Sequence, residues 1–436
     1  MHINIESSSG TKYIFDAIGN NFYANNGEGI LFENNTTFSD REEIVARHAR
    51  DVEKYGNAVD NSAKTLTLET TEQCNLRCSY CTFDEAYPDE RNHGTSVMSL
   101  ETAKKAILDF SKRASDSDVY IVFYGGEPLL RYKFIVESCE YARSIFGQRV
   151  KFSLTTNATL LTGEKIKFIV KENFLITISL DGDQNTHDKF RFTIKNKGTY
   201  DIIKNNLREL KENYFDFYKS NVIFNSVVHS FDSALSMGVI FGSDPLTRNS
   251  QVRFSFLIQN KKSNEIQTDW IEKNKAYIVS QIISQEIIKN KFLLDIALPT
   301  LYNIDVRNLD SDAVVGKKVC IPFVNRTYVR ANGDSQFCER IGKYGGVIDN
   351  NIKQSSDFYL NEFEKLKKMD CMNCHAYNFC QLCPASFIES SGYDLDKLRT
   401  SCEGNRRSVI AFLEMYVDIM EIDPDAIQKC FHLSNG

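Results

Sequence analysis

The sequence predicts an α/β protein built around a partial (β/α)6 barrel, with a small N-terminal α+β module and a C-terminal cysteine-rich domain. Six short segments rich in β-branched and aromatic residues alternate with segments of helix length, a pattern typical of βαβ units and a parallel sheet. The twelve cysteines are clustered: three fall within residues 74–81 and seven between residues 320 and 402. In a reducing compartment, such clusters usually bind metal.

Composition narrows the class of protein. The chain has 436 residues, enough for two or three domains, and its 42% hydrophobic and 25% charged content is ordinary for a soluble protein. A net charge of −6 gives no support for a nucleic-acid partner, and no uncharged apolar run is long enough to span a membrane. The N-terminal MHINIESSSG lacks the pattern of a secretory signal, so we expect a cytoplasmic protein.

Residues 1–62 are predicted to form a separate small module. Residues 11–25 are typical of two short strands around a turn at Gly19 and Asn20. Ser39 can cap a following helix, with Glu42 completing a capping box. Such a piece is too small to fold well alone, so we expect it to dock on the rest of the chain.

Residues 63–265 are predicted to form the barrel, an open relative of the TIM barrel. Polar and sulfur-containing residues gather at the C-terminal ends of its strands, where barrels of this kind carry their chemistry. The predicted strands cover residues 64–71, 119–126, 150–157, 175–182, 222–229 and 252–259, and predicted helices include residues 99–114 and 163–173.

The rest of the chain is predicted to form a helical bridge, residues 266–314, and a cysteine-rich domain with a C-terminal helix, residues 315–436. Within the bridge we expect one long helix over residues 268–290, followed by a linker. Cys139 lies in an amphipathic segment of the barrel and is expected to be a small core residue instead of a ligand.

Cys74, Cys78 and Cys81 form the motif C-x3-C-x2-C, which we call the cysteine loop (residues 74–81). Structural zinc sites normally need four protein ligands, whereas a four-iron cluster held by three cysteines keeps one iron free for another ligand. The alternative is a zinc site with a histidine as fourth ligand, for which His93 is the nearest residue.

The cysteine loop, with Tyr80 as its aromatic residue, resembles the signature of the radical S-adenosylmethionine (SAM) superfamily. The resemblance implies that the three cysteines hold a [4Fe–4S] cluster that binds and cleaves SAM. Gly125, Gly126 and Glu127 resemble that family's GGEP motif, which contacts the amino group of SAM. The resemblance further implies that SAM is contacted by polar residues at the next strand ends: Asn157, Ser179, Asp181 and Arg191. Turn caps and a solvated surface charge are the alternatives for Asn157, Ser179 and Arg191.

The second cysteine group resembles the SPASM domain, an extension of radical SAM enzymes, although the spacing from Cys380 to Cys383 is one residue short of the usual pattern. The resemblance implies two auxiliary [4Fe–4S] clusters, so three clusters in all. One would be held by Cys371, Cys374, Cys380 and Cys402, and the other by Cys320, Cys338 and Cys383. Cys430, a non-protein ligand or a substrate thiolate can complete the second. A pair of zinc sites is the alternative.

Together these resemblances cover about residues 64–410 and imply an enzyme that modifies a peptide. We expect a maturase that removes a hydrogen atom from a ribosomally made precursor peptide and forms a crosslink, foremost a cysteine thioether. Carbon–carbon crosslinking and formylglycine-forming sulfatase maturation are the enzymatic alternatives, and a zinc-stabilised peptide-binding module is the non-enzymatic one. Residues 1–62 resemble the short leader-binding modules of such maturases, so the expected partner is a precursor peptide with a leader; a plain N-terminal extension covering the barrel is the alternative. A flavodoxin or ferredoxin is the expected electron donor.

Overall fold

A mixed eight-stranded sheet forms the centre of the computed structural model, with the strand order β10-β9-β8-β7-β6-β5-β11-β12. The structure describes residues 2–17, 21–24, 30–32, 63–81, 93–256, 263–305, 326–336, 338–339, 374–376, 379–380, 382, 388–389 and 392–435. Six consecutive parallel strands make up the predicted barrel: β5 (Thr65–Thr71), β6 (Val119–Gly125), β7 (Val150–Thr156), β8 (Leu175–Ser179), β9 (Val222–Val228) and β10 (Val252–Phe256). The predicted fold class is therefore confirmed.

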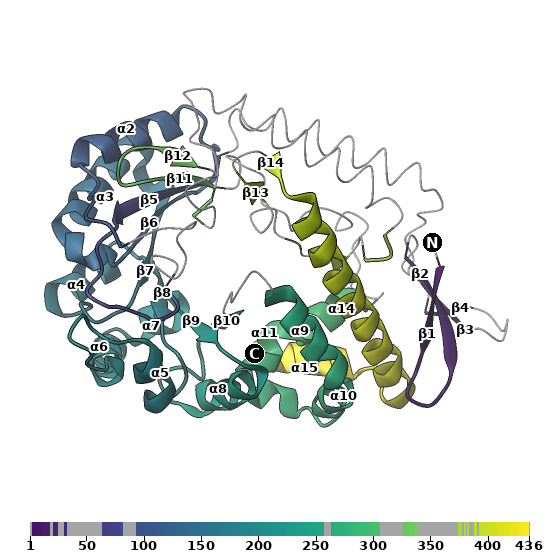
Figure 1. Ribbon diagram of the computed structural model, residues 1–436. Coiled ribbons are helices and arrows are strands. Elements are labelled where there is room, and N and C mark those ends of the chain that lie inside the picture. Colours follow the sequence, from purple (N-terminus) through teal and green to yellow (C-terminus); the bar gives the residue numbers. More distant parts are fainter. Residues whose placement is uncertain are drawn as a thin grey trace.

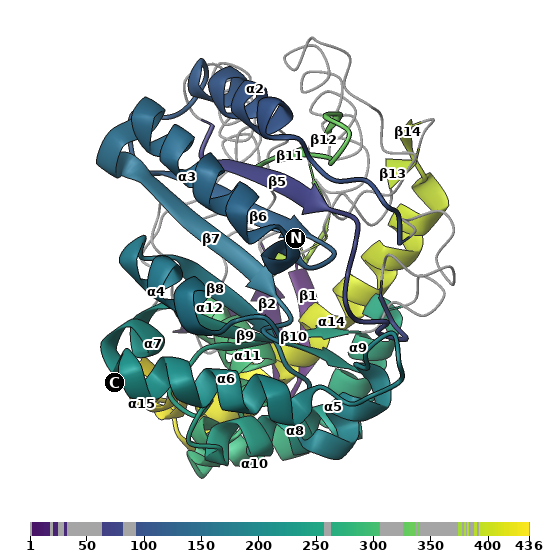
Figure 2. The ribbon, with the colours of Figure 1, turned by 90° about the vertical axis from the view of Figure 1, so that its left-hand side faces the viewer.

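Helices cover the outer face of the barrel (Figures 1 and 2). Aromatic side chains fill the layer between sheet and helices; for example, the rings of Phe152 and Phe174 stack with centroids 5.4 Å apart. Ser99 caps the first outer helix by accepting a hydrogen bond from Thr102 N at 3.0 Å. The outer helices are α2 (Leu100–Ser111), α3 (Tyr132–Phe146), α4 (Gly163–Lys171), α5 (Gln184–Phe190), α6 (Tyr200–Asn213), α7 (Phe215–Asn221) and α8 (Phe231–Ser243), and the short turn η1 (Pro128–Arg131) precedes α3. Cys139 on α3 is 1% exposed, which confirms its prediction as a core residue.

Two short strands from the C-terminal part extend the barrel sheet. Strand β11 (Thr327–Val329) pairs in parallel with β5, and β12 (Ser335–Gln336) pairs antiparallel with β11. The buried Glu69 of β5 fastens this hairpin: its carboxylate accepts hydrogen bonds from Tyr328 Oη at 2.7 Å and Ala331 N at 2.9 Å. The strand that leads into the cysteine loop is thus joined directly to the C-terminal cysteine-rich part.

The helical bridge differs from its prediction. In place of one helix over residues 268–290, the chain forms α9 (Ser263–Lys273), α10 (Lys275–Ile283) and η3 (Glu286–Lys289). The first break follows from Asn274, whose side-chain amide donates to Trp270 O at 2.9 Å, and the second from Gln285, whose φ of 58° is left-handed. The expected linker contains two further helices, α11 (Lys291–Ile296) and α12 (Leu298–Ile304).

A long C-terminal helix, α14 (Leu395–Ile422), separates the N-terminal sheet from the barrel (Figure 1). The helix is preceded by the small hairpin β13 (Ile388–Glu389) and β14 (Gly392–Tyr393), and is followed by α15 (Ala426–Asn435). Within the described residues, no helix combines the length and apolar character needed to cross a membrane.

The N-terminal module contains more strands than predicted. Its antiparallel sheet has four, β1 (His2–Glu6), β2 (Lys12–Asp16), β3 (Asn21–Ala24) and β4 (Ile30–Phe32), of which β2 and β3 are the expected pair. The expected docking is present, and its partner is α14: Phe22 stacks on Tyr416 with centroids 5.1 Å apart, and Ser8 donates through N and Oγ to Asp418. The helix expected after Ser39 lies outside the described residues.

Candidate functional site

The cysteine loop follows β5 and lies against the segment that ends α5. Arg77 N donates to Phe192 O at 2.8 Å and Ser79 N to Phe190 O at 3.0 Å, while Cys81 N closes a turn on Cys78 O at 3.1 Å. These backbone bonds hold the loop at the C-terminal edge of the sheet. All three thiols are partly buried there, as the barrel prediction requires.

The three thiols form a donor set suited to a metal cluster. Burial is the main reason why the pKa of Cys74 is raised to about 12 and that of Cys78 to about 11, and the charges of neighbouring thiols add to this effect. Metal binding overcomes such a penalty because it deprotonates its thiol ligands. Among the described residues, no three His, Cys, Asp or Glu side chains lie close enough to share a single metal ion. Thiolates are the usual ligands of iron–sulfur clusters, and three of them on one short loop are the donor set of a [4Fe–4S] cluster that keeps one iron open, so the chemistry of these residues fits that group.

Gly125 and Gly126 lie where strand β6 meets the chain entering the cysteine loop. A Cβ atom would lie 2.3 Å from Thr71 O at Gly125, whose φ is 131°, and 2.1 Å from Gln73 O at Gly126. Gly126 N also donates to Thr71 O at 2.8 Å. The glycines therefore allow two backbone segments to approach each other, one of which leads directly into Cys74.

The carboxylate of Glu127 points into the protein. It is fully buried and accepts hydrogen bonds from Leu129 N at 2.9 Å, Thr156 Oγ1 at 2.8 Å and Asn157 N at 2.8 Å. Burial raises the pKa of Glu127, and these three hydrogen bonds counteract part of that rise. Its side chain thus joins the ends of β6 and β7, while its backbone N donates to Gln73 O at 2.9 Å and its carbonyl accepts from Leu130 N at 3.2 Å.

Asn157 forms the turn cap that was its alternative prediction, and it also contacts the cysteine loop. As in a turn cap, its Oδ1 accepts from Thr159 N at 3.0 Å. Its Nδ2 donates to Asn75 Oδ1 at 3.0 Å and lies 3.9 Å from Cys74 Sγ, so it also contacts the cysteine loop. Ser179 is half-buried at the end of β8, beside Asn225 of β9.

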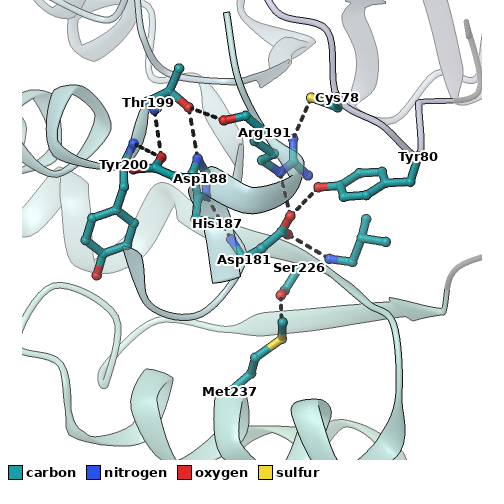
Figure 3. A network of polar contacts seen from close by, with 11 residues as sticks. Cys78, Tyr80, Asp181, His187, Asp188, Arg191, Thr199, Tyr200, Ser226 and Met237 are labelled. Carbon is teal, nitrogen blue, oxygen red and sulfur yellow. Dashed lines mark hydrogen bonds and ion pairs between the residues drawn. The ribbon is translucent and has the colours of Figure 1, made fainter. Parts of the chain in front are cut away.

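Asp181 is the centre of a buried polar network (Figure 3). Its Oδ2 accepts from the hydroxyl of Tyr80 and from Arg191 Nε at 2.8 Å, and its Oδ1 accepts from Val227 N at 2.9 Å. Burial alone would raise the pKa of Asp181, but the charge of Arg191 and the hydrogen bonds from Tyr80 and Arg191 hold it below its ordinary value. The carboxylate is fully buried and its oxygens are occupied by protein donors.

Arg191 is an internal cation. Only 7% exposed, it is not the solvated surface charge that was the alternative prediction. Its guanidinium lies 5.2 Å from the ring centroid of Tyr80, and NH1 is 4.0 Å from Cys78 Sγ. Burial would lower the pKa of Arg191, but the Asp181 carboxylate more than compensates and raises it. The side chain therefore connects β8 to the cysteine loop.

The sequence analysis did not identify His187 and Thr199, which hydrogen-bond to the backbone of Asp181 and Arg191. His187 Nδ1 accepts from Asp181 N at 3.2 Å, so its Nε2 carries the proton and donates to Thr199 Oγ1 at 3.0 Å. Thr199 in turn donates to Arg191 O at 3.2 Å. One signal was available, because His187 lies four residues before Arg191, and Arg191 N donates to His187 O at the end of α5. Glu69 also went unnoticed, since its partners come from the distant β11 hairpin.

Four members of the second cysteine group are described: Cys338, Cys374, Cys380 and Cys402. Arg406 Nε donates to Cys374 Sγ at 3.3 Å, and Cys402 lies one turn before Arg406 on α14. Cys320, Cys371 and Cys383 lie outside the described residues. Cys430 is buried in the helical core, where its thiol donates to Ile282 O at 3.4 Å, so it is placed as a packing residue.

Comparisons with known proteins agree with this geometry. Residues 68–231 match the model of the Radical SAM superfamily. A cysteine-type anaerobic sulfatase-maturating enzyme of Clostridium novyi is 28% identical over 152 residues, 34% of this chain and 40% of that protein. The radical SAM cyclopropyl synthase TigE of Paramaledivibacter caminithermalis is 22% identical over 394 residues, 83% of this chain and 76% of that protein.

The fold also agrees with a solved structure. Native anSMEcpe with bound AdoMet has a TM-score of 0.57 and 18% identity, and the match covers 85% of this chain and 99% of that one. This likeness concerns the fold. The match spans less than half of the length of the sulfatase-maturating relative from Clostridium novyi.

Proposed function

We propose that this chain, whose residues 68–231 form a radical SAM domain, is an enzyme that modifies a ribosomally made peptide by removing a hydrogen atom and forming a crosslink. One observation carries the proposal. Three partly buried thiols follow the first barrel strand and are packed against the Gly-Gly-Glu segment and the Asp181 network.

In this proposal Cys74, Cys78 and Cys81 hold a [4Fe–4S] cluster, and the bound cluster and SAM supply a 5′-deoxyadenosyl radical. The backbone of Gly125, Gly126 and Glu127 lies beside the loop and can receive the SAM amino group, since the Glu127 carboxylate is used internally. Asn157 and Ser179 are the proposed side-chain contacts. Asp181, Arg191 and Tyr80 act as positioning residues, because they are bonded to one another.

The crosslink we propose first is a thioether from a substrate cysteine. The peptide then loses two hydrogen atoms: one is taken from carbon by the radical, and the other leaves the thiol as a proton with one electron. That electron needs an acceptor, which is the role proposed for the C-terminal cysteines, with Cys371, Cys374, Cys380 and Cys402 at one cluster and Cys320, Cys338 and Cys383 at the other. A flavodoxin or ferredoxin is the proposed electron donor for SAM cleavage.

Carbon–carbon crosslinking is the second candidate. The observation that favours it is the match to the cyclopropyl synthase TigE, which extends over 83% of this chain, whereas the match to the sulfatase-maturating enzyme of Clostridium novyi extends over 34%.

The N-terminal sheet is the proposed binding site for the leader of the peptide. Strands β1 and β4 are its two edges, and an edge strand presents unpaired backbone groups to which an extended peptide can add. Because the sheet lies on the far side of α14 from the barrel, the modified segment has to extend around that helix to reach the site (Figure 1).

The test combines peptide mass spectrometry with two triple variants. Anaerobic protein is incubated with SAM, a reductant and candidate precursor peptides, after which disulfides are reduced and free thiols are alkylated. A product that has lost two hydrogens and resists alkylation is a thioether, whereas one that still alkylates has a carbon–carbon bond.

Alanine at Cys74, Cys78 and Cys81 should abolish SAM cleavage. Alanine at Cys320, Cys338 and Cys383 should leave some cleavage without crosslinked peptide, and normal crosslinking by this variant would contradict the auxiliary role.

A further inference from the structure

Contacts with the protein hold both the backbone and the side chain of Arg191 in place. Its backbone N donates to His187 O at 2.8 Å and its carbonyl accepts from Thr199 Oγ1 at 3.2 Å. Its side chain is then held by Asp181 at 2.8 Å and by the face of Tyr80. A guanidinium restrained at both ends has one orientation, and in that orientation NH1 faces the sulfur of Cys78 (Figure 3).

The contact distinguishes Cys78 from Cys74. At Cys78 the neighbour is a permanent cation, with NH1 at 4.0 Å from Sγ. At Cys74 the donors are neutral: Leu76 N at 3.4 Å and the side-chain amide of Asn157, with Nδ2 at 3.9 Å from Sγ. The guanidinium of Arg191 is also buried, and the lower effective dielectric there makes its interaction with a nearby charge stronger than it would be in water.

We infer that Arg191 serves Cys78 as a built-in cationic hydrogen-bond donor that raises the reduction potential of the cluster held by the cysteine loop. The inference rests on the proposed function, which supplies the cluster. Hydrogen bonds to ligand sulfurs and nearby charges set the potentials of iron–sulfur clusters. Reduction adds one electron, and therefore one negative charge, to the cluster. A fixed cation at a ligand sulfur stabilises that reduced form more than the oxidised form.

Asp181 and Tyr80 have a supporting part in this device. A buried guanidinium without a counterion would carry a large desolvation penalty. The Asp181 carboxylate compensates this charge by accepting a hydrogen bond from Nε, and NH1 remains directed at the sulfur of Cys78. The hydroxyl of Tyr80 bonds the same carboxylate, and Tyr80 is itself two residues from Cys78. The loop that carries the ligand is thus tied to the group that tunes it.

The experiment is a potentiometric titration of the anaerobically reconstituted full chain, followed by electron paramagnetic resonance. The signal that changes when SAM is added identifies the cluster of the cysteine loop. Arg191→Gln removes the charge, and Arg191→Lys keeps the charge but cannot reach both Asp181 and Cys78. Lys189→Gln is the matched control, because it removes one exposed positive charge from the last turn of α5, two residues before Arg191.

We expect a more negative midpoint potential in Arg191→Gln, a smaller shift in the same direction in Arg191→Lys, and the wild-type value in Lys189→Gln. SAM affinity, measured by calorimetry on the same variants, is the second readout, because the family resemblance also implies a contact of Arg191 with SAM. An unchanged potential together with weaker SAM binding would overturn the inference and make Arg191 a direct SAM ligand. An unchanged potential with unchanged binding would leave only a packing role.

Two results separate this inference from the proposed function. If wild-type protein takes up no iron, the proposed function fails and the inference fails with it. If wild type holds the cluster but Arg191→Gln loses its iron, the titration of Arg191→Lys decides: a wild-type potential there contradicts the inference, and a negative shift supports it.

Discussion

His187 illustrates how single residues in the barrel are fixed by their partners. It is fully buried, its Nδ1 accepts from Asp181 N, and its Nε2 donates to Thr199 Oγ1, so both nitrogens are satisfied only in the neutral form. Burial is the main cause that lowers its pKa from 6.5 to about 4, with the charge of Arg191 second. Protonation would place a second cation beside Arg191 and break the hydrogen bond from Asp181 N.

Acidification should therefore destabilise the protein through His187. A folded-state pKa below the unfolded one means that the stabilisation is complete above pH 6.5 and is lost as the pH falls toward 4. At about 1.4 kcal/mol for each pKa unit, the difference corresponds to roughly 3 kcal/mol of unfolding free energy. Urea denaturation of metal-free protein across this pH range measures the loss.

The matched variants for this prediction are His187→Asn and His2→Asn. An asparagine at position 187 can still accept from Asp181 N but cannot be protonated, so the decline between pH 6.5 and 4 should flatten. His2 is an exposed strand residue, and its variant should keep the wild-type decline. Parallel curves for wild type and His187→Asn would show that His187 does not control this pH dependence.

Gly126 is the residue on which the placement of the cysteine loop depends most directly. In Gly126→Ala the new Cβ would lie 2.1 Å from the backbone oxygen of Gln73, next to Cys74, so the chain must move. We expect loss of about four irons per chain, the content of one cluster, and loss of SAM cleavage. Iron analysis after reconstitution measures the first, and chromatography of 5′-deoxyadenosine the second.

Gly147→Ala is the control for this substitution. Gly147 has a positive φ of 60°, but a Cβ added there would have no neighbouring atom within 4 Å, so its variant carries backbone strain of about 1–3 kcal/mol without a clash. It should retain the full iron content. Equal iron loss in both variants would mean that general instability, and not the position of the loop, explains the effect of Gly126→Ala.

At the scale of elements, the sequence pattern predicts the six barrel strands, but it does not predict β11 and β12, which extend their sheet. Alternation of strand-like and helix-like segments locates β5 to β10, because each has its own local pattern. Strand β11 has only three residues and exists through pairing with β5, a contact that no local pattern encodes. The break at Gln285 likewise depends on a left-handed residue that is neither glycine nor asparagine.

For the candidate site, the sequence located the motifs but not the contacts between their side chains. The cysteine loop and the Gly-Gly-Glu segment were located by their spacing and their position after β5 and β6. The inward orientation of Glu127 and the closed network of Asp181 and Arg191 could not be foreseen, because they depend on donors from neighbouring strand ends. The sequence therefore places these polar residues at the strand ends, but it does not reveal which of them bond to one another and which face a ligand.

At the scale of the whole molecule, α14 connects three parts of the protein. Its first turns carry Cys402 and Arg406, the latter bonded to Cys374, and its last turns bind the N-terminal sheet through Asp418 and Glu421. The peptide-binding module that we propose is thus mounted on the same helix as a proposed cluster ligand. Docking of the sheet should depend on the Asp418 contacts, which join Ser8 to the helix.

We predict that Asp418→Ala releases the N-terminal sheet without disturbing the barrel. The substitution removes the two hydrogen bonds from Ser8 and should weaken docking by about 3–6 kcal/mol, since each bond to a charged group contributes about 1.5–3 kcal/mol. Limited proteolysis should cut the N-terminal module faster, while SAM cleavage stays unchanged. Glu403→Ala, at an exposed position of the same helix, should behave as wild type. Unchanged proteolysis in Asp418→Ala would mean that the apolar contact of Phe22 with Tyr416 suffices.

The central claim is that the cysteine loop holds an iron–sulfur cluster, and iron and sulfide content tests it most directly. Wild-type protein and the variant with alanine at Cys74, Cys78 and Cys81 are reconstituted anaerobically and analysed side by side. We predict about twelve irons per wild-type chain and about four fewer in the variant, as expected for three four-iron clusters of which one is lost. A full complement of zinc in place of iron, or equal iron in both proteins, would contradict the account.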